Sequence, residues 1–428
     1  MRSSALRVGA SLLALTAALA ASGSGSAAAA SDSAAASGSA ARPAAAWSAG
    51  WAAPVQRPSE GFEDNWSLKG FADQTVRQVV RVTGGGTAAR IRLSNRYGAE
   101  PLRIAGATIA RSAGGAAVEG GSLRRLTFGH RGAVTIPAGG ETASDAAPVR
   151  VAPFESLTVT LYFAEPTGPA TFHAQAYATS YRAEGDHGAD RTGGAFTETT
   201  HSWYYLSDVE LSGGTGRRGS VVAFGDSITD GFGSSYDGNK RWPDRLAERL
   251  AAAGTPRPVL NSGIGGNLLL HDSPWYGDRA GARFGRDVLD KPGVRSVILL
   301  QGLNDIGFSE VDLPTYKPNP QVSAEQVIAG YRDLIARAHA RGVRVVGATI
   351  LPFKGAEYHT ARSEAKRAAI NEWIRTSGEF DAVVDFAEVM ASPSDPLALD
   401  PAYDSGDHKH PNDAGYRRMA EAIDLDAL

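Results

Sequence analysis

Residues 221–231 read VVAFGDSITDG, and this stretch decides the fold of the second half of the chain. Its first four residues are apolar, which is typical of a short strand buried on both faces of a parallel sheet. Gly225 and Asp226 then end the strand and place Ser227 on the turn that follows. Ligands of open α/β sheets bind at the carboxyl ends of the strands. The stretch therefore predicts a serine hydroxyl at the ligand-binding edge of a sheet.

More short apolar runs follow this strand, at 258–260, 294–300, 343–350 and 382–384. Helical stretches lie between them, and the clearest covers 323–341, where apolar residues repeat on one helical face. Ser323 and Gln326 form a capping box at its start, and Gly342 stops it. Alternating strands and helices predict an open, doubly wound parallel sheet.

Polar loops follow three of these strands and precede the last helix. Residues 261–267 read NSGIGGN, 301–305 read QGLND, and 407–411 read DHKHP, directly before a helix predicted over 412–423. Because the carboxyl ends of parallel strands meet at one sheet edge, we expect these loops to converge on Ser227.

These loops contain the groups that a serine nucleophile needs. A serine hydroxyl is a weak nucleophile until a base accepts its proton and a third group orients that base. His410 can act as the base, and Asp407, three residues earlier, as its partner. A tetrahedral intermediate also needs donors for its oxyanion, and the Gly266 N–H, the Asn304 amide and the Ser227 N–H can supply three.

A family resemblance rests on four motifs: GDSITDG at 225–231, GIGGN at 263–267, GLND at 302–305 and DHKHP at 407–411. They resemble the four sequence blocks of the SGNH (GDSL) hydrolases, in the expected order, over about residues 220–428. The resemblance implies a flavodoxin-like doubly wound sheet and a serine hydrolase without cofactor or metal. It implies Ser227 as the nucleophile, Gly266 and Asn304 as oxyanion-hole donors, His410 as general base and then acid, and Asp407 as its partner. The first block reads GDSI where the family name has GDSL.

Other interpretations of these residues stay open. The nucleophile elbow of α/β-hydrolases would need a glycine where this chain has Thr229, which disfavours that fold. Ser227 could be only a turn residue or an N-cap. Asp407 and His410 could form a solvated turn, or bind a metal together with His408 or His271.

The supporting residues of the loops are also open to more than one interpretation. Gly265 competes with Gly266 as the oxyanion donor, because one sequence does not fix the register of the loop. Asp226 is expected to brace the turn, and Asn267 and Asp305 to support the loops.

The first half of the chain, over 47–216, has a different pattern. Leu157–Phe163 alternates apolar and polar residues, which is typical of a half-buried strand. Similar runs lie at 75–83, 89–93, 102–110 and 170–179. Many short strands at such spacing predict an antiparallel β-sandwich. We expect Trp203, Tyr204 and Tyr205, just before the junction, to pack this domain against the next.

This half also carries a vaguer resemblance. The stretches 75–83 and 91–104, together with 226–250, look like a secreted branch of the same hydrolases that has a β-domain before the catalytic one. The predicted catalytic domain then covers 217–428.

The N-terminus predicts export. Arg2 and Arg7 precede an apolar stretch over 8–20 that is followed by small residues, the order of a secretory signal peptide. A retained membrane anchor is the alternative. We predict a signal peptide over 1–30, cleaved between residues 20 and 30, an Ala/Ser/Gly-rich linker over 31–46, and a secreted, extracellular mature protein.

Composition limits the chemistry of this 428-residue chain. It has no cysteine, which excludes disulfides, thiolate nucleophiles and cysteine-bound metals. Its 43 Lys and Arg residues against 46 Asp and Glu residues argue against broad capture of nucleic acid. We expect no nucleic-acid partner, no stable membrane insertion, no cofactor and a monomer.

The sequence therefore predicts a secreted serine hydrolase that cleaves carboxylic esters, small or polymeric, through an acyl-enzyme on Ser227. One alternative is a polysaccharide O-acetyl esterase whose β-domain holds the sugar chain. An alternative of another class is a non-catalytic carbohydrate-binding or surface-binding module.

Overall fold

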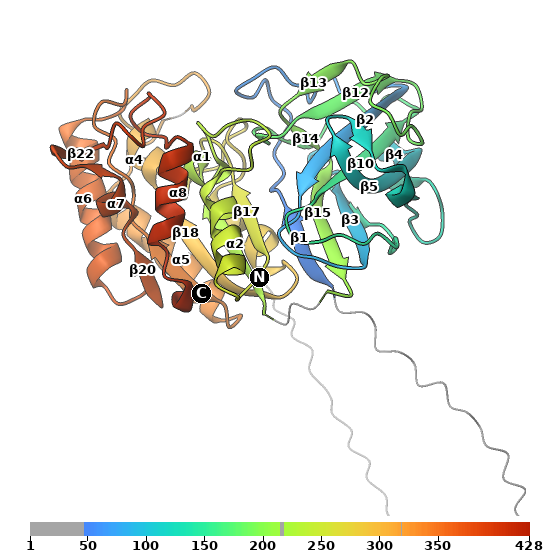
Figure 1. Cartoon of the computed structure of the whole chain (residues 1–428). Coiled ribbons are helices and arrows are strands. Elements are labelled where there is room, and N and C mark those ends of the chain that lie inside the picture. Colours follow the sequence, from blue (N-terminus) through green and yellow to red (C-terminus); the bar gives the residue numbers. More distant parts are fainter. Residues whose placement is uncertain (1–46, 215–217, 318) are drawn as a thin grey trace, which may run out of the picture. The chain divides into compact units, whose positions relative to one another are not determined.

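A five-stranded parallel sheet forms the centre of the second half of the chain (Figure 1). Its strands stand in the order β17-β16-β18-β19-β20, that is, second, first, third, fourth and fifth along this half. This is the order of flavodoxin-like sheets, so the prediction of a doubly wound parallel sheet is confirmed. The strands are β16 (Ser220–Gly225), β17 (Val259–Gly263), β18 (Val294–Leu300), β19 (Arg344–Ala348) and β20 (Ala382–Val384).

The computed structural model describes residues 47–214, 218–317 and 319–428. The predicted signal peptide and linker lie outside the described residues, and the predicted domain boundary at 216/217 falls on a segment that is also outside them. Among the described helices, none combines the length and the apolar character that a membrane span requires.

Helices connect the strands of the parallel sheet and cover it. Helix α2 packs against α8 and α8 against α7, while α5 packs against α3 and α6. Figure 1 shows α2 and α8 in front of the sheet and α5 behind it. The helices are α1 (Ser227–Asp230), α2 (Trp242–Ala252), α3 (Ala280–Phe284), α4 (Leu303–Phe308), α5 (Ala324–His339), α6 (Ala361–Thr376), α7 (Phe386–Met390) and α8 (Asp413–Ala422). A π-helical turn follows α3 at Gly285–Leu289, and 3-10 turns lie at Gly120–Ser122 and Leu425–Ala427.

The register of the sheet brings the predicted loops to one edge. Gly225, the last residue of β16, stands beside Gly263 of β17 on one side and Leu300 of β18 on the other. The segments after these three residues are the GDS turn, the GIGGN loop and the QGLND loop, so all three begin at the same level of the sheet.

The first half folds as two antiparallel sheets, as its alternating pattern predicts. One has the order β1-β15-β3-β9 and the other β13-β12-β2-β10-β5-β6. Inward residues of both sheets, among them Val76, Ile91, Val159 and Val209, share one hydrophobic cluster. The strands are β1 (Ser48–Ala52), β2 (Gln74–Arg81), β3 (Ala88–Ser94), β5 (Gly106–Gly114), β6 (Ala117–Val118), β9 (Glu141–Ala143), β10 (Ser156–Phe163), β12 (Ser180–Glu184), β13 (Glu198–Thr200) and β15 (Leu206–Ser212).

Short strands complete the description. β7 (Arg124–Arg125) pairs with β5, β4 (Leu102–Ile104) with β8 (Val134–Ile136), β11 (Phe172–His173) with β14 (Trp203–Tyr204), and β21 (Ala391–Ser392) with β22 (Asp395–Leu399).

The structure corrects three details of the sequence prediction. The run 170–179 contains only the two-residue strand β11, and Tyr177 has a positive φ of 48°, which no strand accommodates. The run 102–110 is divided into β4 and β5. Trp203, Tyr204 and Tyr205 belong to the hydrophobic core of the β-sheets themselves, because their rings pack on Trp51, Trp66 and Phe71.

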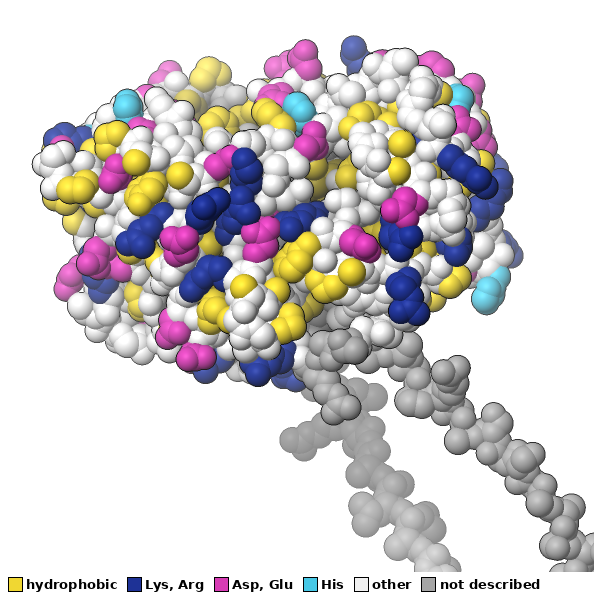
Figure 2. All heavy atoms as spheres, viewed as in Figure 1, with side chains coloured by type: hydrophobic (Ala, Val, Ile, Leu, Met, Phe, Trp, Pro, Cys, Tyr) yellow, Lys and Arg dark blue, Asp and Glu magenta, His cyan; other side chains and the backbone are white. Residues whose placement is uncertain are grey.

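The two halves are in direct contact through polar groups. The Thr83 hydroxyl donates to the Val259 carbonyl and accepts from the Val259 N–H, each at 3.0 Å. Lys291 pairs with the buried Asp208 at 2.5 Å. On the face shown in Figure 2, basic and acidic side chains are interspersed.

Candidate active site

Ser227 begins the short helix α1, and one residue separates it from the end of strand β16. The Asp226 carboxylate accepts a hydrogen bond from the Ile228 N–H at 3.1 Å, so it braces the turn as predicted. Gly231 ends the helix with a φ of 116°, a conformation that favours glycine. The serine hydroxyl is thereby held above the end of the strand, and the residue is 7% exposed.

His410 and Asp407 form a chain of hydrogen bonds with Ser227. The Ser227 Oγ lies 2.7 Å from His410 Nε2, and His410 Nδ1 lies 2.5 Å from Asp407 Oδ2. The other carboxylate oxygen of Asp407 accepts from the backbone N–H groups of His410 at 2.9 Å and Lys409 at 3.1 Å. Asp407 is therefore fixed by its own loop, and His410 is oriented with Nε2 toward the serine.

Burial and charge set the protonation of this pair. Burial of the imidazole lowers the pKa of His410 below 6.5, against the opposite effect of the Asp407 carboxylate. Burial would raise the pKa of Asp407, but its hydrogen bond to His410 and the charges of His410 and Lys409 bring it well below the ordinary value. At neutral pH the histidine is therefore neutral and the aspartate ionised, the states that a general base and its orienting partner require.

The GIGGN loop resolves the choice between its two central glycines. The Gly265 N–H donates to Asp230 Oδ2 at 3.1 Å, so it is already engaged. Among the residues that the structure describes, the Gly266 N–H has no acceptor. Gly266 has a φ of 71°, and a Cβ there would overlap the Tyr276 ring. The Gly266 N–H is thus the one of the two that is free to donate, and its role as an oxyanion donor stays a prediction.

Asn304 reaches the same loop from the start of α4. Its side-chain amide donates one hydrogen bond to the Asn267 carbonyl at 3.0 Å, which leaves its second amide hydrogen for another acceptor. Asp305, its neighbour, accepts from the N–H groups of Leu269 at 2.8 Å and Leu270 at 3.0 Å. Asp305 and Asn267 therefore support the loops, as expected.

Two buried carboxyl groups behind the serine have raised pKa values. Burial raises the pKa of Asp226 to about 7 and that of Asp305 to about 6. Neither side chain hydrogen-bonds to Ser227 or His410 in the structure. They accept backbone N–H groups of the neighbouring turn and loop, so they support the site rather than act on a substrate.

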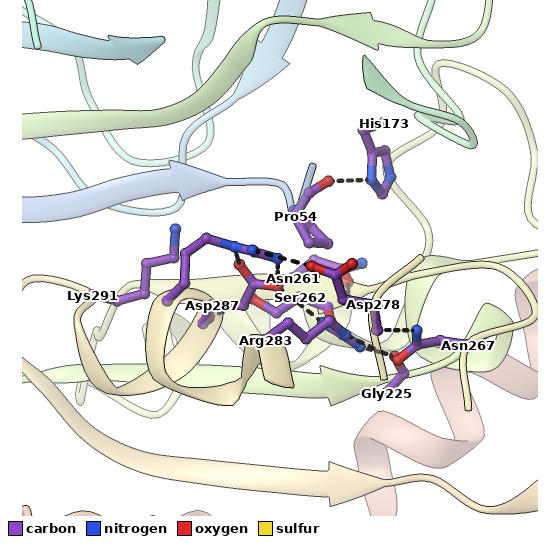
Figure 3. Close-up of polar contacts among 12 residues, drawn as sticks. Pro54, His173, Gly225, Asn261, Ser262, Asn267, Asp278, Arg283, Asp287 and Lys291 are labelled. Carbon is purple, nitrogen blue, oxygen red and sulfur yellow. Dashed lines mark hydrogen bonds and ion pairs between the residues drawn. The ribbon is translucent and has the colours of Figure 1, made fainter. Parts of the chain in front are cut away.

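Arg283 is a supporting residue that the sequence did not reveal. Its fully buried guanidinium donates to the Gly225 carbonyl at 2.8 Å, the Ser262 carbonyl at 2.8 Å and Asn267 Oδ1 at 2.9 Å, and it pairs with Asp287 at 3.3 Å (Figure 3). It therefore ties the ends of β16 and β17 to the GIGGN loop. No sequence signal distinguished it from the arginines of solvated helix faces.

Phe62, from the β-rich half, is a second residue that sequence reasoning missed. A Cβ at Gly265 would lie 2.9 Å from its ring, and its centroid is 5.9 Å from that of Tyr276. The side chain is 41% exposed, which is unusual for a phenylalanine. The partly exposed ring of Phe62 therefore lies beside the GIGGN loop.

The residues proposed for the alternative metal site do not form a group of ligands in the described structure. His408 Nδ1 bonds to Asp404 at 2.7 Å, away from His410. Across residues 47–214, 218–317 and 319–428, no three His, Asp or Glu side chains are grouped as a metal site needs.

Comparison with known proteins assigns a family to this part of the chain. A family model described as the GDSL-like Lipase/Acylhydrolase family matches residues 223–418. Residues 223–418 are a GDSL-like lipase/acylhydrolase domain. The four sequence blocks and the parallel sheet belong to this domain, and the antiparallel β-sheets precede it. No curated protein matches the chain.

Solved structures similar to this chain cover about half of it. An acetylxylan esterase from Geobacillus stearothermophilus is 24% identical and matches 48% of this chain and 91% of its own, with a TM-score of 0.36. A GDSL-like lipase from Bacteroides thetaiotaomicron is 20% identical over 49% and 87% of the two chains, with a TM-score of 0.35. An alpha/beta hydrolase from the metagenome of Lake Arreo is 23% identical over 49% and 94%, with a TM-score of 0.38.

Proposed function

We propose that this GDSL-like acylhydrolase is a secreted carboxylic ester hydrolase that acts through an acyl-enzyme on Ser227. The observation that carries the proposal is the chain of hydrogen bonds from Ser227 Oγ through His410 to Asp407, at 2.7 and 2.5 Å. Secretion is supported by the N-terminal sequence, with its Arg residues, apolar stretch and small residues.

The first half-reaction acylates the serine. Ser227 Oγ attacks the ester carbonyl carbon while its proton moves to His410 Nε2. The carbonyl oxygen becomes an oxyanion, and the Ser227 N–H, the Gly266 N–H and the second amide hydrogen of Asn304 stabilise its charge. The bond to the alcohol oxygen then breaks, and the alcohol leaves with the proton from His410.

The second half-reaction releases the acid. Water gives a proton to His410 Nε2 and attacks the acyl carbon, forming a second oxyanion in the same site. This intermediate breaks down to the carboxylic acid, and the proton on His410 returns to Ser227 Oγ. Asp407 stays ionised throughout, because its partner N–H groups and the imidazolium stabilise the carboxylate.

The packing around the loops supports a short acyl group. The rings of Tyr276, Phe308 and Tyr358 contact one another and are all buried. Tyr276 closes the space behind Gly266, and Lys409, next to His410, lies over the Tyr358 ring at 5.1 Å. This aromatic packing beside Gly266 is the reason for proposing a short acyl group.

Substrate hydrolysis and active-site labelling test the proposal together. Ser227→Ala should abolish hydrolysis of p-nitrophenyl acetate and labelling by a fluorophosphonate, while the melting temperature stays within a few degrees. A series of p-nitrophenyl esters from acetate to decanoate should show kcat/KM decreasing with chain length. Full activity of Ser227→Ala would overturn the proposal, and absence of labelling in the intact protein would favour a non-catalytic binding module. Acetylated xylan in the same panel tests a polysaccharide acetyl esterase.

A further inference from the structure

We infer that the β-rich half is part of the catalytic apparatus, because its His173 positions the oxyanion loop of the hydrolase domain through Asp230. This inference rests on the proposed function. It concerns a contact between a strand of the β-rich half and a helix of the hydrolase domain. His173 lies in β11 of the β-rich half, and Asp230 ends helix α1, three residues after Ser227.

The contact is buried on both sides. His173 Nε2 lies 3.0 Å from Asp230 Oδ1, and each side chain is 2% exposed. His173 Nδ1 lies 2.9 Å from the Pro54 carbonyl, also from the β-rich half (Figure 3). Its ring stacks on Trp203, with the centroids 5.5 Å apart. The imidazole is therefore fixed by its own half and presents one nitrogen to the hydrolase domain.

The second oxygen of Asp230 holds the oxyanion loop. Asp230 Oδ2 accepts the Gly265 N–H at 3.1 Å, one residue before the proposed donor Gly266. Two successive glycines have the greatest backbone freedom of any pair of residues, so their conformation needs an external anchor. The Asp230 carboxylate supplies that anchor, because it fixes the Gly265 peptide and with it the direction of the next N–H.

The hydrogen-bonding pattern shows how the anchor is held. Both ring nitrogens of His173 face only acceptors, namely Pro54 O, Asp230 Oδ1 and, at 3.3 Å, Gln175 O. A neutral imidazole donates from one nitrogen only. The contact of His173 Nε2 with Asp230 Oδ1, at 3.0 Å, orients the carboxyl group.

A catalytic donor works only when it is aimed at the developing oxyanion. A misplacement of about 1 Å can cost on the order of 10²-fold in rate, and loss of a whole donor about 10²–10³-fold. His173 and Asp230 touch neither the serine nor the base, so they are positioning residues. Their loss should lower kcat and leave KM within about threefold, because substrate contacts stay in place.

Matched substitutions of His173 separate this role from simple packing. In His173→Asn, the amide reaches the position of Nδ1 and keeps the Pro54 contact, but it is too short to reach Asp230. In His173→Gln, the amide reaches the position of Nε2 and keeps the Asp230 contact. We expect kcat to fall about 10- to 100-fold in His173→Asn and to stay within about fivefold in His173→Gln.

Asp230→Asn tests the same pattern from the other side. Its amide oxygen can accept the Gly265 N–H, and its NH₂ can face His173 Nε2, so both contacts of the side chain are kept. We expect kcat within about fivefold of the unchanged protein. His187→Ala is the control, because His187 also pairs with an aspartate in the β-rich half, Asp190 at 2.7 Å, and should leave kcat unchanged.

The experiment measures kcat and KM for p-nitrophenyl acetate, the melting temperature, and the Ki of phenylboronic acid, which forms a tetrahedral adduct on the serine. The inference expects Ki to rise in parallel with 1/kcat in His173→Asn, at an unchanged KM. Equal kcat values for His173→Asn and His173→Gln, whether both high or both low, would overturn it. Failure of the proposed function is distinguishable, because only that failure leaves Ser227→Ala active.

Discussion

Asp407→Asn is the substitution whose effect follows most directly from the site. The Asp407 oxygen that faces the loop accepts two backbone N–H groups, those of His410 at 2.9 Å and Lys409 at 3.1 Å. In the asparagine variant these donors hold the amide oxygen in the same place. The amide NH₂ must then face His410 Nδ1, at the position where the carboxylate oxygen now lies 2.5 Å away.

This arrangement selects the wrong tautomer of His410. With an NH₂ donor opposite, Nδ1 becomes the acceptor and Nε2 carries the hydrogen, so the imidazole cannot take the proton of Ser227. Loss of the orienting carboxylate in such a triad costs on the order of 10⁴-fold in kcat. At about 1.36 kcal/mol for each factor of ten, the transition state loses roughly 5 kcal/mol of stabilisation.

The assay is hydrolysis of p-nitrophenyl acetate at pH 8, with thermal unfolding as the test of folding. KM should stay within about threefold, because Asp407 does not face the substrate. Asp404→Asn is the matched control on the same loop, since Asp404 pairs with His408 in the same way, at 2.7 Å, but away from Ser227. A kcat above one tenth of the original in Asp407→Asn, or an equal loss in Asp404→Asn, would refute the reasoning.

Four further predictions follow from other contacts of the site. Because burial lowers the pKa of His410 below 6.5 and only the neutral imidazole accepts a proton, kcat/KM should fall on the acid side of its pH profile with a midpoint below pH 6.5; a midpoint above pH 6.5 would contradict this. Asn304→Ala should lower kcat about 10²–10³-fold through the lost oxyanion donor, with intact folding by circular dichroism. Arg283→Met should lower the free energy of unfolding by about 1–3 kcal/mol, measured by urea denaturation, because the buried Gly225 and Ser262 carbonyls each lose a charged donor, while Asp287 keeps its pair with Arg286. Phe62→Ala should raise KM several-fold for naphthyl esters, about 1 kcal/mol of aromatic contact, at an unchanged kcat, and an unchanged KM would exclude Phe62 from the substrate site.

Much of the fold was accessible from sequence because its signals are local. The apolar run before Ser227, the capping box of Ser323 and the alternation over Leu157–Phe163 each depend on neighbouring residues, and each lies in the element that it predicts. The prediction of a strand over 170–179 was wrong, because contacts with the hydrolase domain set the backbone conformation of this segment. There His173 meets Asp230, and the Tyr177 carbonyl accepts the Asp237 N–H.

The sequence predicts which residues form the candidate site, but it does not fix the register of the GIGGN loop. The motifs point to Ser227, Asn304, Asp407 and His410, because their side chains carry the groups that the chemistry needs. The parallel strands then bring their loops to one edge of the sheet. Whether Gly265 or Gly266 offers its N–H depends on the Asp230 carboxylate at the end of helix α1, and one sequence gives no measure of that distance.

The sequence by itself determined the class of each half, the order of the motifs and the serine that the chemistry would use, because these depend on short periodic patterns and on residue type. Only the tertiary structure decided which glycine is available and which residues support the loop. It brought His410 to Ser227 across 183 positions and His173 to Asp230 across 57. The physical reason is that hydrogen bonds and burial act over a few ångströms in space, and residues that distant in sequence have no local pattern that records their contact.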